Sequence, residues 1–133
     1  MTRHESREQA FILLFERSFN KETELSELIE LAEEYSLLEP DEFFLSLVRT
    51  ADEKDEELNE IISANTRGWK LNRISKVSLA VIKTALTEMI YLEDIPTGVS
   101  INEAVELAKK YATPEDASFV NGLLGTVARS QNA

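Results

Sequence analysis

Apolar residues recur at intervals of three and four along most of this chain, which is the spacing of one face of an α-helix. No stretch alternates apolar and polar residues between turn signals, as a half-buried strand would. The pattern therefore predicts an all-α protein of about six to seven helices. The predicted helices cover residues about 5–20, 24–36, 40–62, 75–92, 100–111 and 115–130. Residues 52–57 contain no apolar side chain, so the third segment either bends or forms two helices.

Residues 75–92 are apolar around most of the helix circumference, whereas the earlier segments carry a stripe on one side. A helix of this kind packs on several sides, so we expect it at the centre of the fold. Glu88 lies in this helix, and local spacing places no second acid or histidine near it. We therefore expect the Glu88 carboxylate to be solvated or capped rather than catalytic.

The stretch 95–125 carries the clearest start signals for helices. Ser100 followed by Glu103 has the form of a capping box, in which each side chain accepts from the other residue's backbone amide. Thr113 is a good N-cap, and Pro114 after it suits the first helical position. Two capped helices joined by a short turn predict a rigid helical hairpin.

Asn121-Gly122 is a β-hairpin signal where alternating strands flank it. Here the flanking apolar residues have helical spacing after a capped start, so we predict helix. Each glycine in a helix interior costs about 1 kcal/mol relative to alanine. We therefore expect Gly122 and Gly125 to let another helix approach closely.

Residues 66–74 form a connector and mark the expected boundary between two helical halves of a single domain 1–133. The N-terminal bundle would cover about 1–66 and the C-terminal bundle about 67–133. Gly68 is suited to end the preceding helix. The side chains expected to anchor the connector in the core are Trp69, Leu71 and Ile74.

Composition excludes several classes of chemistry. The 133 residues include no cysteine and one histidine, His4, close to a terminus where we expect fraying. This leaves no classical catalytic triad and no transition-metal cluster, so we expect neither an enzyme nor a bound cofactor. No apolar run is long enough to span a membrane, and no signal peptide is evident, so we expect a cytoplasmic protein.

The net charge of −11 is unevenly distributed. Residues 22–60 carry a net −13, whereas residues 61–90 carry +4. The acidic block is either a solvated face that maintains solubility, or a surface that repels nucleic acid and attracts a basic protein. Composition leaves two classes open: a helical adaptor that binds RNA with help, and a protein–protein scaffold.

Five segments resemble the NusB family of transcription antitermination factors. They read SREQAFILLFE, RGWKLNRIS, ALTEMIYLEDIP, INEAVELAKKY and FVNGLLG. The resemblance implies a NusB-like fold of two packed helical subdomains. It also implies binding of single-stranded boxA RNA from ribosomal RNA leader transcripts, together with the small-subunit ribosomal protein NusE. The complex would be delivered to the RNA polymerase antitermination complex. Monomer and homodimer both remain open.

The resemblance also implies site residues. Those expected to contact RNA are Arg3, His4, Arg7, Glu115 and Phe119. Those expected to contact the partner are Phe15, Phe19 and Ser78. For the three phenylalanines, packing in the core is the alternative interpretation.

Two positions depart from the family pattern. The N-terminal arm is often arginine-rich in the family, but here it holds only Arg3 and Arg7, with Glu5 between them. The position of Ser78 can carry an acid in relatives. The first departure predicts weak RNA binding by this chain alone and tighter binding when a basic partner supplies phosphate contacts.

Overall fold

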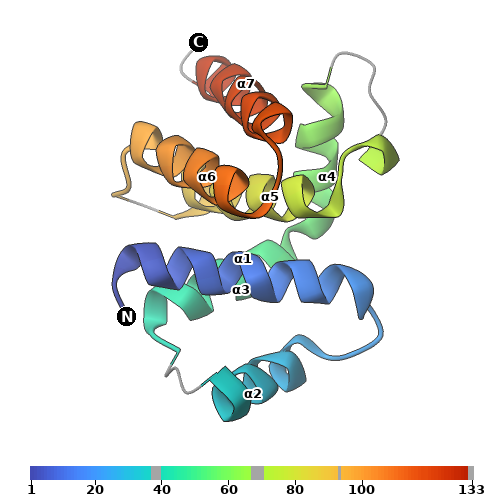
Figure 1. The fold of residues 1–133 in the computed structure, drawn as a ribbon, viewed down its shortest axis with the longest axis vertical. Coiled ribbons are helices and arrows are strands. Elements are labelled where there is room, and N and C mark those ends of the chain that lie inside the picture. The colour runs from blue at the N-terminus through green and yellow to red at the C-terminus, as the bar shows by residue number, and fades with distance from the viewer. Residues whose placement is uncertain (37–39, 67–70, 93, 132–133) are drawn as a thin grey trace.

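Most of the part of the chain that the computed structural model describes is helical, and this part comprises residues 1–36, 40–66, 71–92 and 94–131 (Figure 1). Seven α-helices and one 3-10 turn occur in these ranges, with no strand among them. They are α1 (Arg3–Phe19), α2 (Leu25–Ser36), α3 (Glu42–Glu53), α4 (Asp55–Ala64), η1 (Leu71–Arg73), α5 (Lys76–Tyr91), α6 (Thr97–Tyr111) and α7 (Pro114–Gln131). The all-α prediction is confirmed.

Side-chain caps fix the starts of several helices. Thr2 and Glu5 form a capping box at α1, with both hydrogen bonds at 3.1 Å. Asp41 accepts from the Phe44 amide at 2.8 Å and caps α3. Such caps satisfy amides that the first helical turn leaves unpaired. They therefore set where α1 and α3 begin.

The predicted capping box at Ser100 is wrong. Helix α6 begins one turn earlier, after Pro96, so Ser100 lies inside the helix and is buried. The prediction for Thr113 is confirmed, since its hydroxyl oxygen accepts from the Asp116 amide at 3.0 Å. The segment rich in charged residues divides into two helices at Lys54, which ends α3 and precedes α4.

Helix α5 is the central element, as its apolar circumference predicts. It contacts α1 and α3 on one side and α6 and α7 on the other (Figure 1). Its buried threonines satisfy their hydroxyls within the helix: Thr84 donates to the Ala80 carbonyl at 2.8 Å, and Thr87 donates to the Lys83 carbonyl at 2.7 Å. Polar residues are therefore tolerated on a helix that packs on several sides.

Buried apolar residues form two clusters. The smaller joins α1, α2 and α3 around Leu13, Ile29 and Leu47. The larger joins α1 and α3 to α4, α5, α6 and α7. Leu58 and Ile62 of α4 belong to the larger cluster, together with helices that follow the connector. The division into two halves near residue 66 stays a prediction.

The connector is anchored by apolar residues where the structure describes it. Ile74 is buried in the larger cluster, and Leu71 packs against that cluster, as expected. Gly68 and Trp69 lie outside the described residues. None of the helices in the described ranges is long and apolar enough to cross a membrane.

The glycines of α7 do not serve a close helix approach. Asn121-Gly122 is helical, as predicted, but a Cβ atom at Gly122 would meet no atom of the described residues within 4 Å. Within the same ranges, a Cβ atom at Gly125 would meet the Arg129 side chain of its own helix, at 3.4 Å, and nothing else. The expectation of a tight interhelical contact is therefore wrong, and nothing in the structure explains the choice of glycine there.

Candidate functional site

An ion pair with almost no access to solvent links the first helix to the central one. The Arg7 Nε donates to both carboxylate oxygens of Glu88 at 2.9 Å, and the side chains are 6% and 2% exposed. The Ser100 hydroxyl donates to Glu88 Oε1 at 3.2 Å. One carboxylate thus joins α1, α5 and α6. The prediction of a solvated Glu88 is wrong, because the carboxylate is buried and paired with Arg7. Local spacing could not reveal this contact, since Arg7 lies 81 residues away in sequence.

The resemblance assigns Arg7 to RNA, but the structure holds its guanidinium inside the protein. The residue is 5% exposed, its charge is paired with Glu88, and it lies 5.2 Å from the centre of the Phe43 ring. A phosphate at the surface would have to compete with a buried carboxylate for this group. Arg7 positions α1 against α5 and is not offered to a ligand at the surface.

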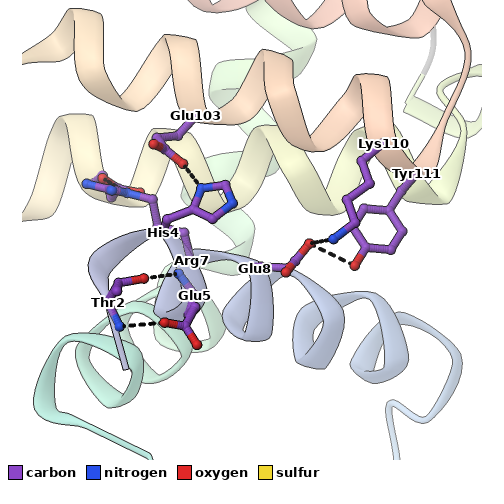
Figure 2. A network of polar contacts seen from close by, with 9 residues as sticks. Thr2, His4, Glu5, Arg7, Glu8, Glu103, Lys110 and Tyr111 are labelled. Carbon is purple, nitrogen blue, oxygen red and sulfur yellow. Dashed lines mark hydrogen bonds and ion pairs between the residues drawn. The ribbon is translucent and has the colours of Figure 1, made fainter.

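The α1–α6 edge, which we define as His4, Glu8, Glu103, Lys110 and Tyr111, carries further polar contacts (Figure 2). The His4 Nδ1 lies 2.6 Å from Glu103 Oε2. Glu8 Oε2 accepts from the Lys110 ammonium at 2.6 Å and from the Tyr111 hydroxyl at 2.9 Å. His4 is therefore held in the first turn of α1, and the expectation of a frayed terminus is wrong at this residue.

These contacts shift the ionisation of the groups involved. The hydrogen bond from Lys110 lowers the pKa of Glu8 against the opposing effect of burial, and the Tyr111 hydroxyl adds to the lowering. The same hydrogen bond raises the pKa of Lys110. Burial raises the pKa of Tyr111, and its hydrogen bond to Glu8 acts in the same direction. These shifts favour the charged forms of Glu8 and Lys110 and the neutral hydroxyl of Tyr111 at neutral pH.

Arg3 lies at the start of α1 as an exposed cation. Its guanidinium carbon stands 4.1 Å from the centre of the Phe43 ring, a cation–π distance. Because Thr2 is the N-cap, Arg3 and His4 belong to the first helical turn rather than to a loose arm. Both side chains reach solvent from fixed backbone positions.

Glu115 and Phe119 lie four residues apart at the start of α7, and so near one face of that helix. Glu115 is exposed, whereas Phe119 is half-buried and packs against the larger core cluster. The path along α6 from Glu103 to Tyr111 covers about 12 Å at 1.5 Å per residue. His4 therefore lies beside the middle of α6, whereas Glu115 follows the C-terminal end of that helix.

Two exposed lysines that the sequence analysis did not single out, Lys109 and Lys110, lie in the last turn of α6, between Glu103 and Glu115 in the sequence. Each side chain is 61% exposed. Lys109 also lines a surface hollow of about 390 Å³ between α6 and α7, together with Ser118 and Asn121. Basic residues are favoured at any helix C-terminus, so the lysine pair gave no functional signal by itself.

The residues predicted to contact a partner lie at the other end of α1. Phe19 is 58% exposed, and its ring meets Phe15 edge-on at 5.1 Å. The Lys76 ammonium, at the start of α5, lies 5.1 Å from the centre of the Phe19 ring. Phe15 is half-buried against the larger cluster. Ser78 is fully buried, and its hydroxyl oxygen has no hydrogen-bond partner among the residues that the structure describes.

A profile of the NusB family matches residues 4–129, nearly the whole chain. The chain belongs to the NusB family. It is similar to the transcription antitermination protein NusB of Acetivibrio thermocellus, with 42% identity over 97% of this chain and 90% of that protein. The resemblance drawn from the five segments is confirmed.

Solved NusB structures share the fold. T. maritima NusB is 30% identical, with a TM-score of 0.85, over 97% of this chain and 92% of that one. A crystal structure of the antitermination factors NusB and NusE in complex with dsRNA is 25% identical, with a TM-score of 0.85, over 98% of this chain and 99% of that one. The expected NusB-like fold is confirmed.

Removing one partner of the Arg7–Glu88 pair leaves a buried charge without its counter-ion. We predict that Arg7→Met and Glu88→Leu each lower the free energy of unfolding by about 3–5 kcal/mol. The double variant should recover most of this loss, because both charges are then absent. Urea unfolding of all four proteins measures the coupling. Additive losses in the double variant would contradict the interpretation.

The contact between Glu8 and Lys110 predicts a stability difference that depends on pH. The pKa of Glu8 lies below its ordinary value of 4.5 in the folded protein. The stabilisation is therefore fully present above the unfolded pKa and is lost as pH falls through the folded pKa. We expect the wild type to be more stable than Lys110→Met at about pH 7, and the difference to close as the pH falls below the folded pKa of Glu8.

The control for this measurement is Lys109→Met, which removes an equally exposed lysine whose contact, with Glu106, is longer at 3.6 Å. Its stability difference from the wild type should be smaller and should vary less with pH. A Lys110→Met difference that stayed constant from neutral to acid pH would disprove the coupling to Glu8.

Proposed function

We propose that this chain is a transcription antitermination factor that binds single-stranded boxA RNA together with the ribosomal protein NusE. The complex would be delivered to RNA polymerase, so the activity is binding rather than catalysis and involves no cofactor. The observation that carries the proposal is the NusB family match over residues 4–129. A NusB of the same fold in complex with NusE and dsRNA supports the binding of NusE and of RNA.

The proposed RNA surface runs along the α1–α6 edge to the start of α7. Cations along it would hold phosphates, while Phe119 would stack on an unpaired base, and Glu115 would accept from a base amino group. The proposed cationic contacts are Arg3, His4, Lys109 and Lys110. The two lysines fill the interval between the groups that the resemblance assigned. Arg7 supports this surface from beneath through Glu88.

The proposed partner surface centres on Phe19. An exposed aromatic ring, ordered by Phe15 below it, offers a large apolar contact at little cost in conformational entropy. Ser78 lies beneath the surface in a fully buried position, so we assign direct recognition to the two phenylalanines. NusE is the partner that the related complex suggests.

A scaffold that binds proteins without RNA is the second candidate, and the charge favours it. The chain carries a net charge of −11, and the burial of Arg7 removes one cation from the surface. Electrostatic attraction to phosphate by this chain alone is therefore weak. The two candidates differ in whether RNA is retained once the partner is present.

We expect weak binding of a boxA-like RNA by the chain alone and tighter binding when NusE is added. Affinities measured at one fixed salt concentration, with and without NusE, test this. If NusE adds nothing to an RNA affinity that is already present, cooperative recognition is wrong. If no RNA is retained in either mixture, the scaffold interpretation replaces the proposal.

Arg3 provides a separate test of the RNA surface. Arg3→Ala should weaken the ternary complex and reduce the slope of log affinity against log salt by about 0.7, the value for one phosphate of a single strand. Arg49→Ala removes an exposed arginine from α3 within the acidic block and serves as the matched control. Equal effects of the two substitutions would exclude Arg3 from the surface.

Phe19→Ala should lower NusE affinity at least about tenfold, because it removes an exposed anchor. Folding stability should change little, since the side chain is 58% exposed. Val99→Ala, at a site 40% exposed on α6, is the control for general loss of apolar surface. Calorimetry with NusE and urea unfolding supply the two measurements. A large stability loss at unchanged affinity would instead place Phe19 in the core.

A further inference from the structure

A groove lies between α1 and α2, on the side of α1 away from α6 and α7 (Figure 1). Its volume is about 320 Å³. Ile12 and Leu13 of α1 line one side, Leu31 and Tyr35 of α2 line the other, and Phe44 of α3 contributes as well. The groove is thus mainly apolar and opens on an outer face of the helical assembly.

Helix α2 carries more apolar surface than the fold uses. Leu28 and Ile29 are 7% and 6% exposed and join the smaller core cluster. Leu31 and Tyr35, which line the groove, remain 42% and 76% exposed. A helix that only packs on a core needs a single apolar stripe. Two neighbouring large apolar side chains left in water beside a groove are typical of an interaction surface.

The charge around this groove has one sign. No lysine or arginine occurs from residue 22 to residue 48, whereas nine acidic residues do. Four glutamates belong to α2 itself, and Glu16 lines the groove from α1. Glu27 and Glu34 precede and follow Leu31 by about one turn, so their side chains lie near its face. Acidic side chains therefore flank the apolar floor, and we refer to them as its acidic walls.

This charge discriminates between possible occupants. Phosphates of a nucleic acid would be repelled, and a second copy of this chain would bring a further net charge of −11. A segment with lysine or arginine around an apolar stripe could contact the apolar floor with its stripe and the acidic side chains with its cations. Laying the apolar face of an amphipathic helix into a groove is a recurrent mode of peptide recognition.

We propose that the groove binds a basic amphipathic segment of a partner protein. Its apolar anchors lie against Ile12, Leu31 and Tyr35, and its cations face Glu27 and Glu34. The site is separate from the surfaces proposed for RNA and NusE. On α1 the groove uses residues 9, 12, 13 and 16, whereas the aromatic stripe uses residues 11, 15 and 19. These sets project from different faces of the helix.

The test uses the full chain and three synthetic helical peptides as probes. The first has leucines at positions i, i+4 and i+7 with lysines elsewhere; the second replaces the lysines by glutamates; the third scrambles the first. Amide shifts in NMR spectra locate binding, and titration gives the affinity. We expect the first peptide to shift groove amides with an affinity that falls as salt rises. The other two should bind at least about tenfold more weakly.

Matched variants separate the apolar floor from the acidic wall. Leu31→Ser should abolish most peptide binding, while Val99→Ser, at a site with nearly the same exposure on α6, should not. Glu27→Lys/Glu34→Lys should reverse the preference between the lysine and glutamate peptides. Glu56→Lys/Glu60→Lys, on exposed positions of α4, makes the same change in net charge and should leave the preference intact. Unfolding curves check that every variant is folded.

Four results with the peptides and variants would overturn the proposal, and a fifth concerns RNA. They are equal binding of the lysine and glutamate peptides, no groove shift with the lysine peptide at millimolar concentration, shifts centred on Phe19, and self-association that Leu31→Ser abolishes. The last would make a second copy the occupant. Groove shifts caused by RNA would also contradict it, because the acidic walls should exclude phosphate. Failure here leaves RNA and NusE binding untouched, since neither peptide nor variants involve those surfaces.

Discussion

The arrangement of the helices depends on a single buried contact between opposite charges. Arg7 and Glu88 are both withdrawn from water, which costs several kcal/mol for each ion unless the partner and further hydrogen bonds compensate. Glu88 accepts from Arg7 and Ser100, so α1, α5 and α6 must adopt one mutual register for the site to be satisfied. Apolar packing alone tolerates small slides between helices, whereas this pair does not. It therefore fixes which side chains of α1 reach solvent.

Much of the helical framework was predictable because its causes are local. Periodic apolar residues identify the helices, and the charged run around Lys54 identifies the junction between α3 and α4. The position of α5 follows from its apolar circumference. Ser100 misled because a serine followed by glutamate resembles a cap, while in the fold its hydroxyl donates to Glu88. Only a contact twelve residues away in sequence distinguishes the two cases.

The sequence was enough to identify the family, but not the arrangement of the site residues. Five short segments pointed to NusB, and the family match extends across nearly the whole chain. Whether an arginine meets solvent or a buried acid depends on the packing of distant helices, so Arg7 was assigned to the surface. Conversely, the sequence does not reveal that Lys109 and Lys110 lie exposed between α1 and α7, because this depends on how the helices pack. Likewise, the acidic block does not predict a groove, because the groove forms only where α2 packs beside α1.

Helix α1 contributes residues to both apolar clusters, and its partners in the two clusters are synthesised at different times. The fully buried residues of the smaller cluster come from α1, α2 and α3, but hydrogen bonds from α1 to α5 and α6 span 81 to 103 residues. At about 5–20 residues per second, a ribosome completes α3 several seconds before α6 emerges. The residues that line the groove are therefore all synthesised before the residues that complete the α1–α6 edge.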